Sequence, residues 1–287
     1  MSTLHCIFRL LIHGQLLMAA SAASYVAVAG ILVNEVPVPL VWLVAAFFGT
    51  LGIYLLDSVR SADREDAISQ SVRAGLFRAN RGWAILSGLL SLGVGGLAVV
   101  WAQVSFEAWV VLILLGVLGL AYLLPVLPVS GRRLTLKDLS LVKPLLISLA
   151  WLVGALLVAR ESMPASPPTS ALLDSMLFGL ATGPTLLLDS LWLDRRDRAA
   201  DVAFGHPTIA SILSVRGFLL IRIVLWGLPC LVLVLDSGFL IPVLGLLGGS
   251  LVLVCLEPDR MGFESTRVVA ASLWRFTLLL VVLCWMG

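Results

Sequence analysis

Charged residues are scarce in this sequence of 287 residues. Aspartate, glutamate, lysine and arginine make up 13% of the chain and hydrophobic residues 60%, whereas about a quarter of an average soluble domain is charged. This shortage excludes an ordinary soluble globular protein and indicates an integral membrane protein. The formal net charge of +2 gives no reason to expect a nucleic-acid partner.

Residues that bind transition metals or carry thiol chemistry are also few. The four cysteines are scattered without a CxxC pair, and His5, His13 and His206 are too far apart in sequence to suggest a ligand cluster. No Walker-type or dinucleotide-binding glycine motif occurs. We therefore expect neither a thiolate or histidine metal centre nor a P-loop enzyme, and we interpret the cysteines as small buried hydrophobes.

Long apolar runs, by contrast, recur along the whole chain, each near the roughly 20 residues that cross a bilayer. The first run continues without a break from "AASAAS" to Val33, so we expect a membrane span rather than a cleaved secretory signal. The sequence predicts one all-helical membrane domain, residues 1–287, built as a bundle of nine transmembrane helices. The nine runs are Leu16–Val33, Val38–Leu56, Gly82–Trp101, Phe106–Val126, Leu141–Val158, Ser170–Leu193, Phe218–Leu235, Phe239–Leu256 and Val268–Met286.

Basic residues fall almost wholly on one side of such a bundle. With nine spans, 18 of the 19 lysines and arginines lie on the side of the amino terminus and of the loops after spans 2, 4, 6 and 8. Arg160 alone lies on the opposite side. Because cytoplasmic loops carry the excess of basic residues, we expect a cytoplasmic amino terminus and an external carboxyl terminus, in a bacterial inner membrane.

Glycines in the third predicted span are interpreted as packing residues. Gly88, Gly93, Gly95 and Gly96 all lie within this span, and small residues let membrane helices approach closely. We therefore expect them to face a neighbouring helix rather than to bind a ligand.

Acidic residues form two groups at equivalent places in the chain. Four lie at the cytoplasmic end of span 2 and four at that of span 6, so the two groups are expected to face each other across one cavity. They are Asp57, Asp63, Glu65 and Asp66, and Asp189, Asp194, Asp197 and Asp201.

The second acidic group has a spacing that suits a metal. At about 100° per residue, Asp194, Asp197 and Asp201 project from one face of a helix. Carboxylates stacked in this way repel one another unless a cation lies between them, and Mg²⁺ takes carboxylate oxygens together with substrate phosphates. The alternative is a solvated loop in which the aspartates are neutralised by arginines, namely Arg195, Arg196 and Arg198.

The residues that follow this group extend the pattern. Asp197 and Asp201 are followed by Gly205 and Thr208, and this order resembles the second aspartate-rich motif of the UbiA-type intramembrane prenyltransferases. "LAYLLPVLPVSGRRLTLKDLSLVKPLLISLAW", residues Leu120–Trp151, is similar to the connection between the fourth and fifth helices of that family. Nine helices and an external carboxyl terminus also fit, so the resemblance covers nearly the whole chain.

The first motif departs from the family pattern, which is N-D-x-x-D-x-x-x-D. The chain has "YLLDSVRSADREDAISQ" here, and aligning Asp57 with the first aspartate puts Arg60 and Arg64 where the next two belong. Asp63 would lie about 240° from Asp57 on a continuous helix, so the two could share a cation only if the helix ended between them. Asp63 and Asp66 are out of register with the shared face, so replacing them by alanine is expected to matter much less than replacing Asp197 or Asp201.

The resemblance implies a chemistry. A polyprenyl diphosphate would be held through Mg²⁺ by the catalytic carboxylates Asp57, Asp197 and Asp201, with Asp194 as a further metal ligand. Its prenyl group would pass to an unidentified aromatic or lipid acceptor, with release of pyrophosphate. Arg73, Lys143 and Arg198 would bind the diphosphate, and Tyr54 and Tyr122 would lie against the allylic cation.

Two alternatives remain open, and two others are disfavoured. A UbiA-type terpene cyclase would quench the cation within its own chain, and a catalytically degenerate member would only bind a prenyl diphosphate. A transporter is disfavoured because the spans carry almost no ionisable residue at mid-depth. A CDP-alcohol phosphotransferase is disfavoured because its D-G-x-x-A-R element is missing.

Overall fold

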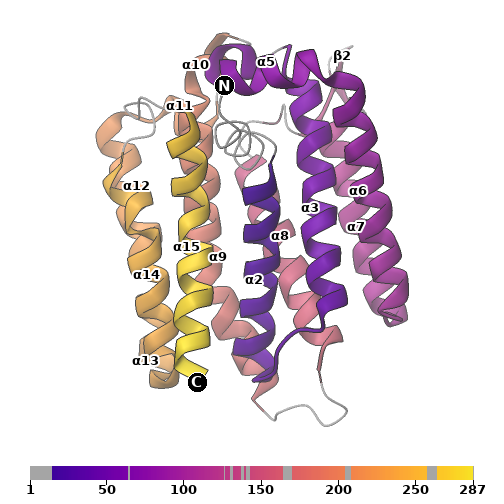
Figure 1. Ribbon diagram of the computed structural model, residues 1–287. Helices are drawn as coiled ribbons and strands as arrows, with labels where there is room; N and C mark the ends of the chain where they lie inside the picture. Colours follow the sequence, from indigo (N-terminus) through magenta and orange to yellow (C-terminus); the bar gives the residue numbers. More distant parts are fainter. Residues whose placement is uncertain are drawn as a thin grey trace, which may run out of the picture.

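The computed structural model describes residues 15–63, 65–125, 127–129, 132–136, 139, 143–163, 170–203, 208–256 and 264–286. These residues form long helices that run between two ends of a bundle, together with one pair of short antiparallel strands (Figure 1). The long helices are α2 (Leu16–Asn34), α3 (Leu40–Ser61), α6 (Arg81–Trp101), α7 (Phe106–Leu123), α8 (Lys143–Glu161), α9 (Ala171–Arg196), α12 (Val215–Gly227), α14 (Leu240–Cys255) and α15 (Glu264–Met286). The short elements are α4 (Glu65–Ser69), α5 (Ser71–Ala79), β1 (Leu127–Val129), β2 (Arg132–Leu134), α10 (Arg198–Ala203), α11 (Ile209–Ile212), α13 (Cys230–Leu235) and the 3₁₀ turn η2 (Ser237–Phe239).

The prediction of a helical membrane protein is confirmed. Seven segments of the described chain are long and apolar enough to cross a bilayer: six of the long helices (α2, α3, α6, α7, α8 and α9) and the segment Val215–Leu235, which contains α12 and α13. Apolar helices also occur at the last two predicted positions, but α14 and the apolar stretch Val269–Trp285 of α15 are shorter than a full span. The number nine therefore stays a prediction.

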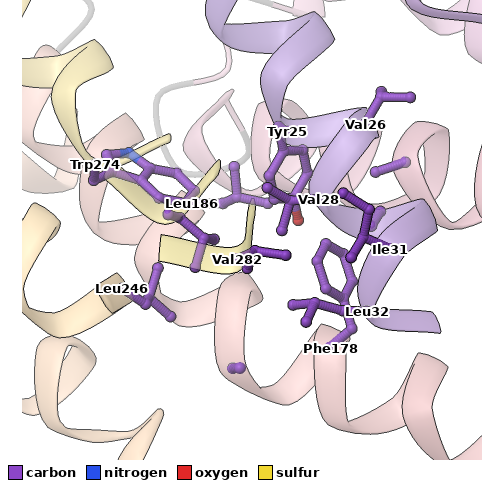
Figure 2. Packing of buried hydrophobic residues seen from close by; sticks show 14 of the residues in the cluster. Tyr25, Val26, Val28, Ile31, Leu32, Phe178, Leu186, Leu246, Trp274 and Val282 are labelled. Atoms are coloured by element: carbon purple, nitrogen blue, oxygen red, sulfur yellow. The ribbon is translucent and has the colours of Figure 1, made fainter. Parts of the chain in front are cut away.

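Helix α2 lies at the centre of the bundle and is mostly buried. Its small residues, such as Ala19, Ala22 and Ala29, allow close approach, and it packs against α3, α8, α9 and α15. Tyr25 marks the middle of this core. Its ring lies 5.4 Å from that of Phe178 on α9 and 5.9 Å from that of Trp274 on α15 (Figure 2).

Helices α3 and α6 make the most extensive contact between helices in the described chain, and glycines make it possible. A Cβ atom added at Gly52 would lie 2.8 Å from the carbonyl oxygen of Gly88, and one at Gly95 would lie 2.9 Å from the backbone nitrogen of Gly49. The packing role predicted for Gly88 and Gly95 is confirmed. It is wrong for Gly93 and Gly96, where an added Cβ atom would meet nothing within 4 Å.

The short polar elements gather at one end of the bundle. Figure 1 shows α5, α10, α11 and β2 at the end where α2 begins, whereas α15 finishes at the opposite end. One end of the apolar bundle is therefore polar. Helices α3, α7 and α9 all finish at this end and lead into the short elements there. We call this region the polar end.

Candidate functional site

A break in the helix after span 2 decides how the first acidic group is presented. Helix α3 ends at Ser61, Ala62 and Asp63 lie in a turn, and α4 begins at Glu65. Asp63 points outward: its side chain is 56% exposed and pairs with Arg78 and Arg81 at 3.0 and 3.2 Å. Asp66, after the turn, is 3% exposed. The expectation that Asp66 lies on the wrong face is therefore wrong, because it assumed a continuous helix.

Asp66 is held by a dense set of donors. Arg73 on α5 donates from Nε to Oδ2 at 3.1 Å and from Nη2 to Oδ1 at 2.6 Å. The Ser61 hydroxyl donates to Oδ2 at 2.9 Å. Arg73, predicted to bind diphosphate, thus fixes a carboxylate in this state of the protein.

Asp197 closes the carboxyl end of α9 and reaches the first acidic group through a glutamine. Arg196 donates to its Oδ1 and Oδ2 at 2.9 and 2.6 Å. Gln70 lies between the two groups, with its Nε2 atom 3.5 Å from Oδ1 of Asp66 and 3.5 Å from Oδ1 of Asp197. Burial acts to raise the pKa of Asp197, but the adjacent Arg196 guanidinium and its hydrogen bonds hold that pKa below its usual range.

Lys143 brings a third part of the chain into this cluster. It is the first residue of α8, and its Nζ atom lies 2.7 Å from Oδ1 of Asp194. The two side chains are 9% and 3% exposed, and Oδ2 of Asp194 has no hydrogen-bond partner among the described residues. Lys143 also lies within electrostatic range of Asp197, Asp201 and Tyr122. Lys143 is thus brought together with the aspartates of the second motif.

Asp201 completes the group on α10. The Thr208 hydroxyl donates to its Oδ2 at 3.2 Å, which joins the two ends of the predicted motif. Gly205, the other marker of that motif, lies outside the described residues. Burial raises the pKa of Asp201 to about 7, and the negative charges of Asp194 and Asp197 add to that shift.

Asp57 is the predicted catalytic carboxylate of span 2. It lies on α3, before the helix break. Tyr54, on the same helix, is within electrostatic range of Asp57, Asp189 and Arg275. The Tyr54 hydroxyl accepts a hydrogen bond from the indole of Trp151. The convergence of Asp57 with Asp197 and Asp201 stays a prediction, whereas Asp66 is the span-2 carboxylate that shares Gln70 with Asp197.

Two of the predicted substrate-binding residues lie at the margin of the cluster. Arg198 is exposed on α10. Tyr122 is half-buried near the end of α7, and its backbone carbonyl accepts a hydrogen bond from Arg60 at 3.3 Å. These positions do not test whether Arg198 binds the diphosphate or whether Tyr122 contacts the allylic cation, so both roles stay predictions.

A buried ion pair deeper in the bundle was missed by the sequence analysis. Arg275 on α15 is paired with Asp189 on α9, and its guanidinium carbon lies 4.3 Å and 4.6 Å from the ring centres of Trp151 and Trp274. Asp189 lies seven residues before the last residue of α9, about 10 Å along the helix. The spans therefore do carry ionisable groups well inside the bundle. The feature of the sequence that indicates this pair is a single arginine, Arg275, within an apolar run. Counting Arg275 among the cytoplasmic basic residues overlooked its position inside the run.

The donor set of the polar end suits magnesium, although the arrangement is not a bare metal cage. All the candidate ligands are oxygens, and two of their buried atoms, Oδ2 of Asp194 and Oε1 of Gln70, have no hydrogen-bond partner within the described ranges. In those ranges, however, no three acidic, histidine or cysteine side chains are close enough to hold an ion by themselves. The residues therefore fit Mg²⁺ that arrives with an anionic substrate, which supplies the remaining ligands.

Comparisons with protein families, with curated proteins and with solved structures found no match to this chain.

Proposed function

We propose that this protein is an Mg²⁺-dependent intramembrane prenyltransferase, which transfers a prenyl group from an allylic polyprenyl diphosphate to an aromatic or lipid acceptor and releases pyrophosphate. One observation carries the proposal: carboxylates and basic side chains from three separate parts of the chain meet at one end of an apolar bundle. Asp66 comes from α4, Lys143 from α8, and Asp194 and Asp197 from the end of α9. Such a site offers charged groups for the diphosphate and, next to them, apolar helices for the hydrocarbon tail of a prenyl diphosphate.

The basic residues of the polar end have a defined task in this reaction. The carbon–oxygen bond of the allylic diphosphate breaks with its electron pair on the diphosphate, and a new bond forms between that carbon and the acceptor, which loses a proton. Lys143, Arg73 and Arg196 provide positive charge where the diphosphate gains negative charge. Asp197, Asp201 and Asp66 would hold Mg²⁺, which would supply further positive charge to stabilise the departing diphosphate.

We also propose an orientation of the protein in the membrane. Apolar helices at all nine predicted positions support nine spans, and the basic residues of α5, α8 and α10 support a cytoplasmic polar end. The amino terminus would then be cytoplasmic and the carboxyl terminus external, in a bacterial inner membrane.

A second function is favoured by the ion pairing of the cluster. Asp66, Asp194 and Asp197 are each already matched by a basic partner, namely Arg73, Lys143 and Arg196. A site balanced in this way could hold a prenyl diphosphate without ionising it. The alternative is therefore a membrane protein that binds the diphosphate and does not catalyse transfer.

Pyrophosphate release separates the two functions. Purified protein in nanodiscs would be given geranyl, farnesyl or geranylgeranyl diphosphate, Mg²⁺ and a panel of aromatic and lipid acceptors. We expect pyrophosphate release that stops when Mg²⁺ is chelated. Binding of the diphosphates without release would contradict the transferase and establish the binding function.

A further inference from the structure

Gln70 contacts one carboxylate of each acidic group, Asp66 of the first and Asp197 of the second. It lies at the junction of α4 and α5, is 1% exposed, and follows the helix break that turns Asp66 inward. Both of its contacts use the Nε2 atom and are 3.5 Å long, which is the outer limit of a hydrogen bond. Its Oε1 atom is buried and accepts no hydrogen bond from the described chain.

A buried amide oxygen without a donor is unusual, since nearly all buried polar atoms are paired. Rotation of the Gln70 amide by half a turn would exchange its nitrogen and oxygen. The oxygen would then lie about 3.5 Å from Oδ1 of Asp66 and of Asp197, the two atoms that the nitrogen now contacts. In an octahedral Mg²⁺ site with bonds of about 2.1 Å, neighbouring ligand oxygens are about 3.0 Å apart.

We propose that Gln70 is a metal ligand of the polar end: its amide turns to offer Oε1 to a divalent cation held between Asp66 and Asp197. Without the cation the same amide donates to both carboxylates and keeps their Oδ1 atoms in position. This ligand set, Asp66, Gln70 and Asp197, differs from the set of aspartates expected from the sequence, and it rests on the proposed function only for the nature of the substrate.

The charges around Asp66 and Asp197 indicate that the cation binds only together with an anion. The charges of Asp66 and Asp197 are matched by Arg73 and Arg196, whose guanidinium groups lie 2.6 Å from carboxylate oxygens. A bare divalent cation would therefore enter a site without net negative charge and bind weakly. A diphosphate group supplies the missing charge and further oxygen ligands. Cation and diphosphate should thus bind together.

Manganese with inorganic pyrophosphate is the probe, because it needs no prenyl substrate and no acceptor. The full chain in detergent would be titrated with Mn²⁺ at saturating pyrophosphate, and free Mn²⁺ would be measured by electron paramagnetic resonance. Gln70→Met removes the oxygen at nearly constant volume and should weaken Mn²⁺ binding about 10–100-fold. Gln70→Glu adds a charged ligand and should tighten it about tenfold. Asn80→Ala, which changes an exposed amide beyond the end of α5, should leave it unchanged.

The outcomes separate the ligand from the proposed function. Equal Mn²⁺ affinities for wild type, Gln70→Met and Gln70→Glu, or no Mn²⁺ binding by the wild type, would overturn the role of Gln70. Mg²⁺-dependent pyrophosphate release with such equal affinities would leave the transferase standing without this ligand. Gln70-dependent Mn²⁺ binding without prenyl transfer would support the ligand and reject the transferase.

Discussion

Lys143 and Asp194 join the first residue of α8 to the end of α9, with Nζ and Oδ1 2.7 Å apart in a nearly water-free setting. Because removal of one member of a buried pair leaves the other charge uncompensated, Lys143→Met should lower the free energy of unfolding by about 3–5 kcal/mol. Replacing both residues, by Lys143→Met with Asp194→Leu, should restore most of this loss. Unfolding in mixed micelles measures the stability of each variant.

Activity should respond differently from stability in the same series. The double variant lacks the positive charge next to the diphosphate, so pyrophosphate release should stay about 10²–10³-fold below wild type although the fold is recovered. Arg216→Met, an exposed change at the start of α12, is the control and should alter neither property. Recovery of activity together with stability would limit Lys143 to a structural role.

Asp66 and Asp63 provide a test of the helix break. Asp66→Ala should reduce pyrophosphate release by about 10²-fold or more, since it removes a buried carboxylate beside Gln70 and Asp197. Asp63→Ala should change it less than about twofold, because exposed ion pairs contribute little. The opposite order of effects would mean that Asp63, not Asp66, turns toward α10 in the working protein.

The pKa of Asp201 predicts how stability depends on pH. Burial raises this pKa from 3.8 to about 7, so the folded protein binds a proton that the unfolded chain has lost. The stabilisation is complete below pH 3.8 and is lost as the pH rises through about 7. Wild type should therefore lose stability between pH 5 and pH 8 in Mg²⁺-free buffer relative to Asp201→Asn. Thermal unfolding of the two proteins across this range gives the comparison, and parallel curves would contradict it.

Arg275 and Asp189 should behave as a packed ion pair. Arg275→Met alone should destabilise the protein by about 3–5 kcal/mol, because it leaves Asp189 charged in the apolar core. Arg275→Met combined with Asp189→Leu should be close to wild type in stability. If that double variant is stable but inactive, the pair acts in the reaction as well as in the fold.

Topology is testable with reporter fusions. A cytoplasmic reporter should be active when fused within the connection between α9 and α12, and an external reporter when fused after residue 286. The expectation follows from the basic residues at the polar end and from the opposite positions of that end and the last residue of α15 (Figure 1). Activity of the same reporter at both places would put them on one side of the membrane and contradict the predicted topology.

The positions of the apolar helices could be predicted from the sequence because bilayer thickness alone sets their length. The arrangement of the first acidic group could not. Its geometry depends on where α3 ends, and neither proline nor glycine marks the break between Ser61 and Glu65. A register that assumed a continuous helix therefore gave the wrong face for Asp66.

The same limit applies to partner choice among charged residues. Arg195, Arg196 and Arg198 look equivalent in sequence, yet Arg196 pairs with Asp197, Arg198 is exposed, and buried Arg195 donates to the carbonyl oxygens of Ala210 and Leu213. Sequence pattern gives the charge that each residue carries. Tertiary packing decides whether that charge meets a carboxylate, a helix end or water.

The glycine contacts between α3 and α6 have a mechanical consequence. Because Gly52 and Gly95 leave no room for a side chain between the two backbones, α3 and α6 should tilt in the bilayer together, as one rigid unit. Helices α4 and α5 connect the end of α3 to the start of α6. The tilt should therefore move Asp66 and Gln70 toward or away from α10. A bilayer thin enough to force that tilt would change the distance between Asp66 and Asp197, the two carboxylates of the proposed metal site, so lipid chain length would act on the protein as an effector.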